Sequence, residues 1–76
     1  MKNAKFWLVK EGEVFPAKAT TQWDGETSIL VFATSPKAAL EVARAYDNGR
    51  VQPDNVWYEG RAVAAAFIQR EDGSFL

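Results

Sequence analysis

The sequence of 76 residues contains no cysteine and no histidine. Without cysteine the chain forms no disulfide and offers no thiolate, and a small domain of this kind fits the reducing cytoplasm. Without histidine it lacks the commonest general base, and without either residue the usual ligands of zinc, haem and iron–sulfur sites are missing. We therefore expect a non-enzymatic protein with no catalytic residue, no cofactor and no metal ion.

Long apolar runs near the N-terminus and a strong net charge are also absent. Only four apolar residues, Phe6 to Val9, follow the first five residues, whereas a signal peptide needs about 7–15 and a membrane helix about 18. Nine Lys and Arg residues face ten Asp and Glu residues, a net charge of −1 that lacks the basic signature of nucleic-acid-binding domains. We expect a cytoplasmic protein that does not enter a membrane.

The chain is long enough for one domain, residues 1–76, and its apolar content of 47% is sufficient for one core. The run Phe6 to Val9 predicts a strand, which ends at the polar turn of residues 10–13. Residues 14–21 alternate in part and predict an edge strand, because Pro16 removes a ladder donor. A third strand is expected over residues 27–33, after the Asp24-Gly25 turn signal.

Residues 36–48 predict a helix. Ser35 is a good N-cap, and Pro36 suits the first helical position, where its missing N–H costs nothing. Apolar side chains then follow the i, i+3, i+4, i+7 spacing of a buried helix face, with Leu40 beside them: Ala39, Val42, Ala43 and Tyr46. Asn48-Gly49 supplies the left-handed residue that ends many helices.

The last third of the chain is less decisive. Val56 to Tyr58 is strand-like, and Glu59-Gly60 favours a turn or a bulge. Residues 61–69 fit a helix or a strand; the strand is preferred because Asp72-Gly73 predicts a hairpin that brings residues 74–76 back onto it. The expected fold is α+β: an antiparallel β-sheet of four to five strands with one helix packed on one face, in the order ββ(β)αββ.

The aromatic residues suggest where a partner binds. Adjacent rings in a strand point to opposite faces, so a sheet covered by one helix is expected to carry Trp or Tyr rings on its open face. Trp and Tyr dominate interface hot spots, and acidic residues lie near them in the sequence. The expected partner-binding residues are Trp23, Asp24, Glu26, Asp54, Trp57, Tyr58 and Glu59.

Two other functions compete with protein binding. A nucleic-acid-binding module would stack bases on the sheet aromatics and contact phosphates through Lys2, Lys5, Lys10 and Lys18. An enzyme would need two carboxylates across a cleft, one of them desolvated, which a domain of this size has little room to build. Protein binding is preferred, including a homodimer that forms through the open face or an edge strand.

The element order, with a helix that opens Ser35-Pro36-Lys37-Ala38-Ala39-Leu40, resembles small proteins of phages and mobile elements, among them anti-CRISPR inhibitors. That resemblance implies an inhibitor that binds a CRISPR effector subunit and blocks its functional surface. The acidic residues Asp24, Glu26, Asp54 and Glu59 would then face a basic groove. Small antitoxins are similar too, but Gly25-Glu26-Thr27 leads here into a predicted strand, where an antitoxin would have a helix.

Overall fold

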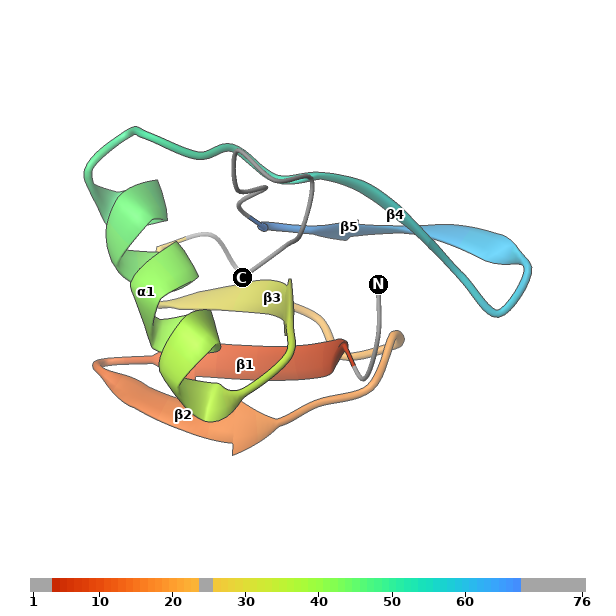
Figure 1. Ribbon diagram of the computed structural model, residues 1–76, viewed down its shortest axis with the longest axis horizontal. Coiled ribbons are helices and arrows are strands. Elements are labelled where there is room, and N and C mark those ends of the chain that lie inside the picture. The colour runs from red at the N-terminus through yellow and green to blue at the C-terminus, as the bar shows by residue number, and fades with distance from the viewer. Residues whose placement is uncertain (1–3, 24–25, 68–76) are drawn as a thin grey trace.

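The computed structural model describes residues 4–23 and 26–67 and shows an α+β protein with one helix and five strands (Figure 1). Its elements follow one another in the predicted order ββ(β)αββ. They are β1 (Lys5–Lys10), β2 (Glu13–Pro16), β3 (Ser28–Ala33), α1 (Pro36–Asp47), β4 (Asp54–Tyr58) and β5 (Arg61–Ala65). Within the described residues no helix is long and apolar enough to span a membrane.

The first three strands form an antiparallel sheet of order β2-β1-β3. The turn between β1 and β2 has positive φ at both central residues, Glu11 (53°) and Gly12 (80°), as a two-residue hairpin turn that matches strand twist requires. β2 lies on the outer edge, as expected of a strand that contains proline, but it ends at Pro16 and is shorter than the strand predicted over residues 14–21. β3 is apolar from Ile29 to Ala33 and buried throughout that run.

The helix begins and ends where the sequence signals lie. The Ser35 hydroxyl accepts a hydrogen bond from the Ala38 N–H at 3.1 Å, and Pro36 starts the helix. At the other end Gly49 has a φ of 73°, and the N–H of Arg50 donates to the Ala45 carbonyl at 2.8 Å, which makes a Schellman motif. The predicted helix over residues 36–48 is therefore confirmed to within one residue.

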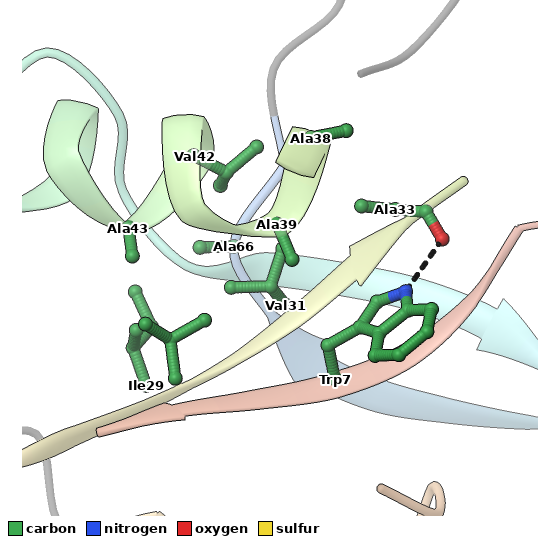
Figure 2. Packing of buried hydrophobic residues seen from close by; sticks show 10 residues of the cluster. Trp7, Ile29, Val31, Ala33, Ala38, Ala39, Val42, Ala43 and Ala66 are labelled. Carbon is green, nitrogen blue, oxygen red and sulfur yellow. Dashed lines mark hydrogen bonds between the residues drawn. The ribbon is translucent and has the colours of Figure 1, made fainter. Parts of the chain in front are cut away.

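The helix covers one face of the three-stranded sheet (Figure 2). Small and β-branched helix residues lie against Val31 and its neighbours on the sheet, and the largest fully buried one among them is Val42. The indole N–H of Trp7 donates to the Ala33 carbonyl at 3.1 Å, so this buried polar group has its partner. Leu40 is only half-buried, at the border of the cluster.

The last two strands form a hairpin of their own. Arg61–Ala65 is a strand, which confirms the preferred interpretation for that part of residues 61–69, and its partner is β4. The predicted hairpin of residues 74–76 lies outside the described residues. A parallel bridge between Val31 and Ala66 joins this second sheet to β3, with N–H···O distances of 3.2 Å (Phe32 to Ala66) and 2.9 Å (Ala66 to Leu30). The strands thus form a sheet of three and a sheet of two.

The face of the three-stranded sheet opposite the helix was expected to be open, and this expectation is wrong. The β4–β5 hairpin folds back over it and buries Phe6, Leu30 and Phe32 against Val63 and Ala65. This face is covered because Phe6 and Phe32 both lie on it. Covering two large rings removes a large apolar area from water, which stabilises the packed hairpin. Both faces of the sheet therefore belong to the core.

Candidate functional site

The β4–β5 hairpin presents one face to solvent, and this face is the candidate site. Side chains alternate along a strand, so the inner face carries Val56, Tyr58 and Val63, while the intervening residues point outward. The outward residues are paired across the strands as Trp57 with Ala62 and Asn55 with Ala64, and all are exposed. We call these four residues the hairpin face.

Trp57 dominates the hairpin face. Its side chain is 74% exposed, whereas Phe15, the other exposed large hydrophobic residue among those described, is 43% exposed. The residue opposite Trp57 is Ala62, which is too short to cover an indole. Tryptophan is the residue type most enriched among binding hot spots, because a single ring removes a large apolar area from water when a partner covers it.

The hairpin is held in place from its inner side. The Tyr58 ring meets Phe6 edge-on at 5.0 Å between centroids and Phe32 at 5.9 Å, and Phe6 and Phe32 lie 4.8 Å apart. Because Trp57 precedes Tyr58 in the strand, burial of the tyrosine directs the tryptophan outward. The exposed ring therefore projects from a strand with a fixed position, which lowers the ordering cost when a partner binds.

The structure brings four of the predicted site residues together on this hairpin. Asp54 and Glu59 are exposed at the start of β4 and in the turn, and Trp57 lies between them. Tyr58 is on the same strand but half-buried on the inner face, so its role is to anchor the hairpin rather than to contact a partner. Glu59 has a φ of 50°, which identifies the Glu59-Gly60 pair as a two-residue turn.

Trp23 and Glu26, the two other predicted residues that the structure describes, are not part of the hairpin face. Trp23 is half-buried, with its ring edge-on to Tyr46 at 6.3 Å, and it lines a depression together with Ala62 and Ala64 of the hairpin face. Asp24 lies outside the described residues. Glu26 is exposed on the helix side of the sheet, on the wall of a depression of about 300 Å³ that contains no hairpin residue. The predicted acidic surface is thus divided between separate parts of the molecule.

Sequence reasoning missed three members of the hairpin face, which are Asn55, Ala62 and Ala64. The Glu59-Gly60 pair is the sequence signal that could have identified them. A two-residue turn there fixes the register across the hairpin, and the register names every residue opposite or diagonal to Trp57. Alanine by itself favours a helix, so Ala62 and Ala64 carry no signal for an exposed strand face until the register is known.

A nucleic-acid-binding module and a metal-dependent protein would each require a different kind of surface from the hairpin face. Of the aromatic residues that could stack on bases, Phe6 and Trp7 are only 2% and 7% exposed, whereas Trp57 is exposed. The Lys5 ammonium lies over the Trp7 ring, 5.4 Å from its centroid. Within residues 4–23 and 26–67 no three His, Cys, Asp or Glu side chains are placed to hold a metal ion.

Comparison of the chain with protein-family models, with curated proteins and with solved structures gives no match. The fold is that of a small α+β domain with a helix on one face of a three-stranded sheet and a hairpin on the other. Function is therefore inferred from the geometry of the hairpin face.

Proposed function

We propose that this protein is a non-enzymatic protein-binding domain and that the hairpin face is its contact surface. The observation that carries the proposal is Trp57, the most exposed large hydrophobic side chain of the described residues, on a strand anchored from behind by Tyr58. An indole held in this way fits a pocket on a partner, with Ala62 and Ala64 allowing the partner to approach the backbone closely.

The mode of action we propose is inhibition by occupying a partner's functional surface. Asp54 begins β4 and Glu59 follows its last residue in the turn; both are exposed, and strand alternation places Asp54 on the face opposite Trp57. An exposed indole on a hairpin that also carries exposed carboxylates suits a partner with an apolar pocket beside a basic surface, because the charges steer association and the ring supplies affinity. A nucleic-acid-binding groove of a CRISPR effector subunit, the partner that the resemblance of the element order implies, would supply the basic surface.

The test compares Trp57→Ala with Phe15→Ala, which removes the other exposed ring. Tagged wild-type protein is used to capture partners from bacterial extract, and captured proteins are then purified and titrated against both variants. We expect Trp57→Ala to weaken binding by about 2 kcal/mol or more, a factor of about 30, and Phe15→Ala to change it less than threefold. Equal binding by wild type and Trp57→Ala would refute the proposed surface.

The inhibitory role is tested separately with purified CRISPR effector complexes. Target cleavage is measured with wild-type protein and with Trp57→Ala, and inhibition by the wild type alone supports the proposal. Recovery of nucleic acid in the capture experiment, released by moderate salt, would instead favour a nucleic-acid-binding module, because phosphate contacts weaken steeply as salt rises.

A further inference from the structure

The two outermost strands differ in how well their free edges are protected. β2 has four residues and ends at Pro16, which has no N–H to offer, so this edge is poorly suited to pairing. β4 has five residues, contains neither proline nor lysine, and includes the β-favouring run Val56-Trp57-Tyr58. Among the described strands β4 pairs only with β5, which leaves its other edge available.

The register of the hairpin identifies the backbone groups on that edge. A two-residue turn closes on a hydrogen-bonded pair, here Tyr58 with Arg61, and antiparallel pairs then alternate between bonded and non-bonded. Trp57 and Asn55 occupy the non-bonded positions, so their N–H and C=O groups point away from β5. The Asn55 N–H in fact donates to Oδ1 of its neighbour Asp54, at 2.7 Å.

We propose that β4 pairs antiparallel with β4 of a second copy of this chain, about a two-fold axis at Val56. Asn55 then lies opposite Trp57 of the second copy, and the backbone groups that face outward on each strand meet their partners. The contact is isologous, because Asn55 of one copy meets Trp57 of the other while Trp57 of the first copy meets Asn55 of the second. The two hairpins become one continuous four-stranded sheet.

Side chains and charges agree with this register. Asp54 lies opposite Tyr58 of the second copy, and the cross-strand neighbour of that tyrosine is Arg61, a cation. No like charges stand directly opposite each other. Trp57 lies beside Asn55 of the second copy and loses part of its exposed surface. A two-fold axis perpendicular to the sheet keeps both Trp57 rings on the same face, so the pair presents a doubled hairpin face that favours a bivalent partner.

The pairing uses short strands and buries less area than a standard interface, so we expect a dimer that dissociates on dilution. Sedimentation equilibrium from about 10 µM to about 1 mM covers the range of such weak complexes. The average mass should rise with concentration from that of the 8.5 kDa chain toward twice this value. A mass that stays at one chain throughout the range would overturn the proposal.

The decisive variant is Asn55→Pro, which removes an outward N–H without removing a bond to β5. We expect it to weaken self-association at least tenfold, whereas Asn55→Ser, which keeps the N–H, leaves it within about threefold. Thermal melting shows whether each variant folds. If Asn55→Pro does not fold, Trp57→Lys serves instead, since it alters only an exposed side chain and places a charge at the new contact. A dimer that persists in the folded edge variants would place the contact elsewhere.

Discussion

The two faces of the three-stranded sheet are covered by different kinds of side chain. On the helix side the contacts are made by alanine and β-branched residues, with Trp7 at the margin held by its hydrogen bond to Ala33. On the hairpin side they are made by the rings of Phe6, Phe32 and Tyr58. Small side chains let the helix approach the sheet closely along its length. Rings instead hold the hairpin to the sheet at a few points of contact.

Because their contacts with the sheet differ, we expect the helix and the hairpin to differ also in local stability. The helix is closed at both ends by hydrogen bonds, at Ser35 and at Gly49, and its inner residues are fully buried. The hairpin is joined to the sheet by the Tyr58 ring, by the buried side chains of Val63 and Ala65, and by one bridge at Ala66. Segments with fewer buried contacts open more readily than the core, so we expect the hairpin to exchange its amide protons faster than the helix and β1–β3.

The largest effect is expected from Val42→Asp, on the helix side. Val42 is fully buried, and an unpaired carboxylate there costs about 3–5 kcal/mol. The whole domain is stable by about 4–11 kcal/mol at the usual value per residue, so the variant should lose a large part of its stability and melt far below the wild type. Circular dichroism melting checks this, with the exposed Lys37→Asp as a control that should melt within a few degrees of the wild type. A cooperative wild-type melt for Val42→Asp would contradict the assigned helix face.

A smaller and local effect is expected from Tyr58→Ala. The change removes the ring that contacts both Phe6 and Phe32, at a cost of about 2–3 kcal/mol. Native-state hydrogen exchange should accelerate in β4 and β5 more than in β1 and β3, because the hairpin opens while the helix side stays packed. Equal acceleration in all strands would show that the two sides unfold as one unit. Trp57→Ala is the matched control and should leave exchange nearly unchanged, since that ring is exposed.

The smallest effect is expected from Glu59→Asn, and it is stabilising. Glu59 adopts a φ of 50°, a left-handed conformation that asparagine tolerates better than glutamate in a two-residue turn. We expect a gain of about 0.5–1 kcal/mol, which raises the melting temperature by about 2–8 °C in a domain of this size. Glu59→Gln removes the charge but not the backbone preference, and it should leave the melting temperature unchanged. If both variants gain equally, charge rather than conformation is responsible.

Local signals determined most of the elements. Ser35-Pro36 begins the helix and Asn48-Gly49 ends it, because a cap depends on residues within one turn of the chain. The β-strands and the Glu-Gly turns follow from alternation and from the need for positive φ at glycine. These features depend on residues a few positions apart, and the sequence alone was enough to predict the α+β class and the element order.

The tertiary structure decided where the second half of the chain lies and, with it, the candidate site. Whether Phe6 faces solvent or a second layer depends on a hairpin, β4–β5, that is far away in the sequence, and no local pattern contains that information. Trp57 and Tyr58 are adjacent aromatic residues with the same propensity, yet the contact with Phe6 and Phe32 buries Tyr58 and leaves Trp57 exposed. The physical reason is that burial of apolar area is a property of the assembled core, so the choice between the two faces is made only when distant segments pack together.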